Sequence, residues 1–192
     1  EAFGQLAQAL APGYRVAAVF DEQFHAPFKF YRMEPQTLYL SGFAEPTADG
    51  LVVRAALHSR RELGQPGLPP QVKLHFTANV LLARELDAPT TEFAPPAAEA
   101  LPIAAEAIYR VYFHGPAYQV LERAGVEGQT AIGLMADALP PNTDPADTAS
   151  VLAPRLIELC FQTAGVWDIQ TTGTMALPLG IGAVTVYRQP EE

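Results

Sequence analysis

The chain has 192 residues, 49% of them hydrophobic and 17% charged, which suffices to bury the core of one domain or of two small ones. Its formal net charge of -9 argues against sequence-independent nucleic-acid binding, because such binding needs many cationic side chains to displace counterions from phosphates. No apolar run approaches the ~20 residues that cross a bilayer, and residues 1–10 lack the cationic flank of a secretory signal.

The first half of the chain predicts one helix followed by about four strands. Apolar residues at helical spacing favour a helix from Glu1 to Leu10, which ends where Ala11-Pro12-Gly13 breaks the period. Strand-like segments bounded by turn residues follow at residues 14–20, 37–43, 51–57 and 72–82.

Residues 87–106 are rich in Ala, Pro, Thr and Glu, a composition that is typical of a linker. This segment divides the chain into residues 1–86 and 107–192. The second part predicts strands at residues 108–113, 130–136 and 181–187. It also predicts a helix over residues 154–169, since Pro154 suits the first helical turn.

The two predicted helices share the pattern Glu-x-x-x-Gln-x-Ala, which begins at Glu1 and again at Glu158. Residues four apart lie one above the other on a helix, so Glu158 and Gln162 share a face. The second helix is apolar on nearly every other side, which indicates a buried helix and a desolvated Glu158. Such a carboxyl suits a general acid, and a solvent-facing or capping role for Glu158 has about equal weight.

The single cysteine, Cys160, lies on the same predicted helix between the apolar Leu159 and Phe161. It has no cysteine partner within the chain, so we expect a buried thiol in a reducing compartment. A cytoplasmic location follows from this expectation.

The spacing Pro154-x-x-x-Glu158-x-x-x-Gln162 is similar to P-x-x-x-D-x-x-x-Q/H, a motif of the double hot-dog dehydratase domains of polyketide and polyunsaturated fatty acid synthases. Glu158 replaces the usual Asp. The stretch from Glu1 to Gln5 likewise resembles the E-A-x-x-Q helix of single hot-dog dehydratases. Phe113-His114-Gly115-Pro116-Ala117-Tyr118 is similar to the family's Y-G-P-x-F element, and Leu177-Pro178-Leu179-Gly180-Ile181 to its L-P-x-x-I turn.

This resemblance covers nearly the whole chain and implies an α+β fold, the double hot dog, in which two antiparallel sheets each wrap around a long central helix. Residues 1–86 would form the first hot dog without its N-terminal strands. Residues 107–192 would form the second, short of its C-terminal strands. The fold would therefore be truncated at both ends.

The resemblance implies a 3-hydroxyacyl-[acyl-carrier-protein] dehydratase, a hydro-lyase that removes water to give a 2-enoyl thioester. Glu158 would protonate or orient the departing hydroxyl, and Gln162 would hold its carboxyl by hydrogen bonding. The implied substrate tunnel comprises His114, Gly115, Pro116, Tyr118, Phe161, Leu177 and Pro178. No metal or organic cofactor is implied. The substrate is attached as a thioester to the phosphopantetheine of an acyl carrier protein. That carrier and neighbouring synthase domains are the expected partners, and a homodimer is left open.

The family's catalytic base is a histidine in an H-x-x-x-G-x-x-x-x-P element that precedes the first helix. None of the four histidines here has glycine four residues later. We therefore expect the base to lie upstream and this chain alone to be inactive, with a natural pseudo-enzyme as the competing explanation. His25 and His114 neighbour Gly or Pro in predicted turns, where a structural role is more common than catalysis.

Two other functions stay open. A hot-dog thioesterase would use the same acid to activate water and would release a free acid. A product-template-like module would hold an acyl chain without turning it over.

Overall fold

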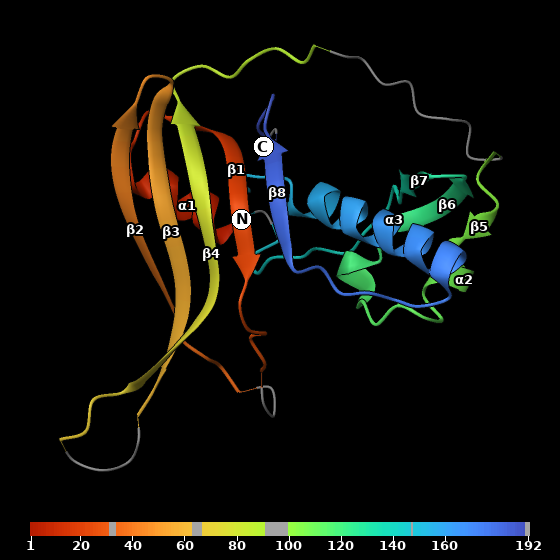
Figure 1. Ribbon diagram of the computed structural model, residues 1–192, viewed down its shortest axis with the longest axis horizontal. Helices are drawn as coiled ribbons and strands as arrows, with labels where there is room; N and C mark the ends of the chain where they lie inside the picture. The colour runs from red at the N-terminus through yellow and green to blue at the C-terminus, as the bar shows by residue number, and fades with distance from the viewer. Residues whose placement is uncertain (31–33, 63–66, 91–99, 147, 191–192) are drawn as a thin grey trace. The chain divides into compact units, whose positions relative to one another are not determined.

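The computed structural model describes residues 1–30, 34–62, 67–90, 100–146 and 148–190, which fall into two compact units (Figure 1). The first unit comprises Glu1–Pro89 and Pro178–Glu191, and the second comprises Thr90–Leu177. The division differs from the predicted one at the C-terminal end, because the last strand pairs within the first unit. Residues 178–191 are thus not part of the second unit, to which the sequence assigned them.

The first unit is a five-stranded sheet with one helix, α1 (Ala2–Leu10), packed on it (Figure 1). Its strands follow the order β2-β3-β4-β1-β8, and every neighbouring pair is antiparallel. Their bounds are β1 (Arg15–Phe24), β2 (Leu38–Thr47), β3 (Gly50–Arg61), β4 (Gln71–Ala83) and β8 (Gly180–Thr185).

Every second residue of the central strands β3 and β4 contributes to the core of this unit. One face of β3 and β4 is buried against α1, while the residues between point to the other face. The buried set is Val53, Ala55, Leu57, Ala78, Val80 and Leu82, together with Phe3 and Ala7 of α1. The helix and the four strands predicted for this half are confirmed, and each strand is longer than predicted.

The second unit is a three-stranded antiparallel sheet, ordered β5-β6-β7, against which a long helix packs. Its elements are β5 (Ile103–Ala104), α2 (Ala105–Ile108), the 3-10 helix η3 (Pro116–Tyr118), β6 (Leu121–Glu127), β7 (Thr130–Met135) and α3 (Pro154–Thr172). Helix and sheet approach closely at Gly133, where an added Cβ would collide with the side chain of Thr163. The core comprises Ile108, Tyr112, Leu121, Ala124 and Val166.

The second half departs from the sequence-based prediction in two places. The strand predicted at residues 108–113 is wrong, because the chain there leaves α2 through a turn. Alanines favour the helix, and Tyr112 packs against α3 instead of pairing in a sheet. Strand β6 was not predicted, since its sequence mixes charged residues with Gly125. The start of α3 is confirmed, and it ends where Gly173 adopts a left-handed φ of 73°.

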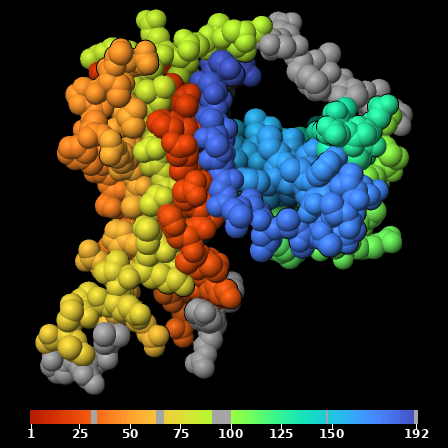
Figure 2. Space-filling view, viewed as in Figure 1, coloured from red at the N-terminus to blue at the C-terminus, as the bar shows by residue number. Residues whose placement is uncertain are grey.

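Helix α3 buries one face only. Gln162 and Val166 are buried, whereas Leu156 is 51% exposed and Cys160 is exposed. Atoms of this segment, in blue, reach the surface in Figure 2. The expectations of a helix buried on nearly all sides and of a buried Cys160 thiol are therefore wrong, because the sheet of this unit packs against only one side of the helix. Within the described ranges, no helix has the length and apolarity to cross a membrane.

Candidate functional site

The structure brings Glu158 and Gln162 together on one face of α3, as their spacing predicts. The Gln162 side-chain Nε2 donates a hydrogen bond to Glu158 Oε1 over 3.0 Å. Gln162 is 2% exposed, whereas the Glu158 side chain retains 25% exposure. The carboxyl is therefore anchored from the buried side and remains accessible from the other.

The amide of Gln162 is fully hydrogen-bonded. Its Nε2 also donates to the backbone carbonyl of Tyr118 over 2.8 Å, and its Oε1 accepts from the Tyr109 hydroxyl over 2.8 Å. A carbonyl oxygen can only accept, so the amide cannot be flipped without losing this bond. Gln162 must therefore present an N–H to Glu158.

Two tyrosines hold α3 against the segment that follows α2. Tyr112 donates its hydroxyl to the backbone carbonyl of Gln162 over 2.7 Å, and the Tyr109 hydroxyl accepts from the Leu121 amide over 2.7 Å. An added Cβ on Gly165 would lie 2.5 Å from the Tyr112 hydroxyl oxygen, so the contact depends on a glycine in α3.

Burial keeps these hydroxyls protonated. Burial raises the pKa of Tyr112 to about 12, and the negative charges of Tyr109, Glu158 and Asp168 add to the effect. Burial likewise raises the pKa of Tyr109, with Glu158 adding to the shift and the Leu121 hydrogen bond opposing it. Burial therefore extends to higher pH the range over which both tyrosines remain neutral hydrogen-bond donors.

His114 also reaches the carboxyl. Its Nε2 lies 2.9 Å from Glu158 Oε1. The ring stacks on Phe113 with centroids 4.6 Å apart, and the His114 carbonyl accepts from the Gln119 side chain over 3.1 Å. An irregular segment before η3, and not the predicted turn, thus places the His114 imidazole against the candidate acid.

Only some of the other residues predicted to line the tunnel lie near Glu158. Tyr118 contributes its carbonyl to Gln162, and Phe161 is the half-buried neighbour of Gln162 on α3. Gly115 and Pro116 are exposed beside His114. The chain passes from the second unit to the first between Leu177 and Pro178, so their place in a tunnel stays a prediction.

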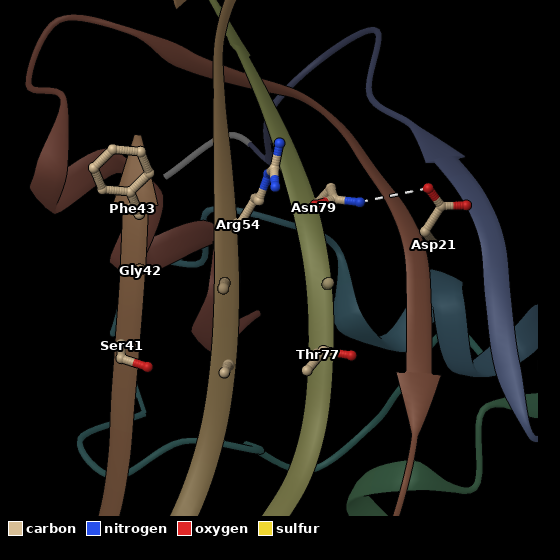
Figure 3. Close-up of a pocket in the computed structure, with 10 residues that line it drawn as sticks. Asp21, Ser41, Gly42, Phe43, Arg54, Thr77 and Asn79 are labelled. Carbon is tan, nitrogen blue, oxygen red and sulfur yellow. Dashed lines mark hydrogen bonds between the residues drawn. The ribbon is translucent and has the colours of Figure 1, made fainter. Parts of the chain in front are cut away.

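Glu158 lines neither of two surface hollows that the described residues form. One, of about 520 Å³, runs between α3 and β7 and is lined by Gln129, Ala131, Ile132, Gly133, Leu159, Cys160, Thr163, Ala164 and Trp167. The other, of about 460 Å³, lies on the first sheet, where Asn79 donates to Asp21 over 3.4 Å beside Arg54 and Phe43 (Figure 3). Neither hollow contains a residue that the sequence singled out for the tunnel.

His75 is buried, and its two ring nitrogens contact groups of the first unit. It is 3% exposed, its Nε2 lies 2.8 Å from Ser59 Oγ, and its Nδ1 lies 3.1 Å from the Ala26 carbonyl oxygen. This histidine therefore ties the segment after β1 to the sheet. Among the described side chains, no three of His, Cys, Asp or Glu converge closely enough to hold a metal ion.

Sequence reasoning missed Tyr109 and Tyr112. Their signal is a pair of tyrosines three apart, which places them near each other on a helical turn. The prediction of a strand at this position hid that signal.

Comparison with known families adds an independent finding. Residues 87–192 match the family model described as polyketide synthase dehydratase N-terminal domain. No curated protein matches the chain. The matched stretch holds Glu158, Gln162 and His114, and it covers more than half of the 192 residues. The chain therefore belongs to the polyketide synthase dehydratase N-terminal domain family.

Proposed function

We propose that this chain supplies the acid for dehydration of a 3-hydroxyacyl thioester. The observation that carries the proposal is the Glu158 carboxyl, which Gln162 anchors at Oε1 and which keeps one side accessible. Membership of the dehydratase family supports a hydro-lyase role for the parent protein.

The proposed chemistry moves protons and no redox equivalents. A base removes the C2 proton, the electron pair of that C–H bond forms the C2=C3 double bond, and the C3–O bond breaks. Glu158 transfers its proton to the departing hydroxyl, so that water leaves and Glu158 remains as a carboxylate. The proton on the base then returns Glu158 to its acid form through solvent. The base is a histidine outside the four in this chain.

We infer a double hot dog as the scaffold. Each unit places a helix against an antiparallel sheet, which is the basic element of a hot-dog half. The first half would comprise β1 to β4, α1 and β8, and the second would comprise β5 to β7 and α3.

The proposed substrate is carried by a protein and not by a dissociable cofactor. A 3-hydroxyacyl chain on the phosphopantetheine of an acyl carrier protein would enter past His114, Gly115, Pro116 and Tyr118. Elimination of water needs no electron acceptor, so the proposal includes no organic cofactor or metal. Neighbouring synthase domains would be the other partners, in the cytoplasm.

Replacing the acid tests the proposal. In the parent synthase, Glu158→Gln should lower the dehydration of a 3-hydroxybutyryl N-acetylcysteamine thioester by about 100-fold or more, because the amide cannot donate an acidic proton. The matched control is Glu122→Gln, since Glu122 is exposed on β6. The enoyl product is followed by its ultraviolet absorbance.

Other outcomes separate the alternatives. Full activity of Glu158→Gln contradicts the assignment of the acid. Release of the free 3-hydroxy acid by the parent identifies a thioesterase. Binding of the thioester without turnover identifies a non-catalytic acyl-binding module.

A further inference from the structure

Two nitrogen atoms approach the same oxygen of Glu158. Gln162 Nε2 lies 3.0 Å from Oε1, and His114 Nε2 lies 2.9 Å from it. The Gln162 nitrogen is a donor, because the Tyr118 carbonyl fixes the orientation of its amide. Oε1 therefore already accepts one N–H, and the position of the imidazole proton decides whether it accepts a second.

The surroundings of the His114 ring select between its two neutral tautomers. Nδ1 is buried and has no hydrogen-bond partner in the part of the chain that is described. A proton on Nδ1 would bury a donor without an acceptor and would turn the Nε2 lone pair toward Oε1. With the proton on Nε2, the Nε2–H group donates to Glu158 Oε1, and only the lone pair of Nδ1 is left without a partner. The Nε2–H tautomer is the favourable one.

The remaining polar groups at the site are occupied elsewhere. The Tyr109 and Tyr112 hydroxyls bond to Gln162, and the Tyr118 hydroxyl accepts from Asn142 over 3.4 Å. Arg155, one turn before Glu158, donates to the Pro140 carbonyl. Among the described residues, no hydrogen bond involves Glu158 Oε2. The two N–H donors on Oε1 thus leave Oε2 open.

We propose that His114 is a positioning residue that donates Nε2–H to Glu158 Oε1 and thereby assigns the acidic proton to Oε2. This inference rests on the proposed function of Glu158. With two donors, Oε1 acts as the carbonyl oxygen of the carboxyl group. Oε2 is then the oxygen that carries the proton and faces the departing hydroxyl. His114 acts through Glu158 and does not itself remove the C2 proton.

The tautomer is tested without any enzyme activity. Proton–nitrogen correlation NMR of the 192-residue chain, with His114 assigned from its loss in His114→Gln, should show the ring proton on Nε2. Glu158→Gln should shift the His114 Nε2 resonance and leave that of His58, which stacks on Tyr39, unchanged. A proton on Nδ1, or no response to Glu158→Gln, overturns the proposal.

Conservative rescue tests the positioning role in the parent synthase. His114→Ala should lower kcat by about 10- to 100-fold with KM changed less than about threefold, because a charge-assisted hydrogen bond is lost in the reacting state. His114→Gln, which keeps an N–H donor, should recover kcat to within about fivefold, and His58→Gln is the matched control. If His114→Gln is as slow as His114→Ala, the positioning role is wrong. A parent without dehydratase activity refutes the proposed function alone, since the NMR result decides the tautomer independently.

Discussion

Gln162 illustrates how a single buried amide determines the geometry of an accessible carboxyl. Its two side-chain hydrogens and its oxygen are engaged by Glu158, Tyr118 and Tyr109. Burial of such a group is favourable only when each hydrogen bond is made, so any change among its partners moves the carboxyl. The motif spacing predicts the Glu158–Gln162 pair. It cannot predict the tyrosines, which are some fifty positions away in sequence and meet α3 only through packing.

Removing one hydroxyl tests this network. Tyr112→Phe should lower the free energy of unfolding by about 1 kcal/mol at neutral pH, because the Gln162 carbonyl loses a buried hydrogen bond. Urea unfolding measures the change. Tyr187→Phe is the control, since Tyr187 is 44% exposed. Equal losses in the two variants would contradict a specific role for Tyr112.

The same variant should change the response to alkali. The pKa of Tyr112 rises from 10.0 to about 12 on folding, chiefly through burial. Between these values the native state binds more protons than the unfolded state, so stability is intact below pH 10 and is lost as the pH rises toward 12. Tyr112→Phe should therefore lose less stability between pH 10 and 12 than the unmutated chain, as measured by urea unfolding at several alkaline pH values. If the free energy of unfolding falls equally with pH in both chains, Tyr112 does not contribute.

At the scale of elements, the packing of α3 on β7 depends on Gly133. Gly133→Ala should lower the free energy of unfolding of the second unit by about 1–3 kcal/mol, because the new methyl group meets Thr163 and Leu121. Gly182→Ala is the matched control, since nothing lies within 4 Å of a Cβ at that position. Denaturant midpoints followed by Trp167 fluorescence measure the effect, and an unchanged midpoint for Gly133→Ala would contradict the close contact.

Elements were predictable where local patterning agrees with tertiary packing. The strands β3 and β4 alternate clearly because one face is buried, and Pro154 marks the start of α3. The helix ends at Thr172, three residues beyond the predicted end, because Gly173 was not used as an end signal. Strand β6 lacked such a signal, since Glu122 and Gly125 interrupt its apolar residues. Exposure of Cys160 was not predictable from its apolar neighbours, because it depends on how much sheet lies beside α3.

At the scale of the whole chain, strand β8 is expected to be essential for the first sheet. Ending the chain after Leu177 removes one of the two partners of β1 and leaves only β4, so exchange of the β1 amides that face β8 across Ala18–Gln23 should accelerate by at least about 10-fold. Ending it after Arg188 keeps β8 and its Val186–Ala17 hydrogen bond and is the control. Mass spectrometry of deuterium uptake measures both, and equal protection of β1 would contradict a stabilising role for β8.

The pairing of β8 with β1 also has a consequence for the order of synthesis. The second unit is inserted between Ala83 of β4 and Gly180 of β8, so the ribosome releases it entirely before the fifth strand of the first sheet exists. Until then, β1 presents an open edge to the nascent chain's surroundings. The first sheet is therefore completed only after the whole second unit has been synthesised.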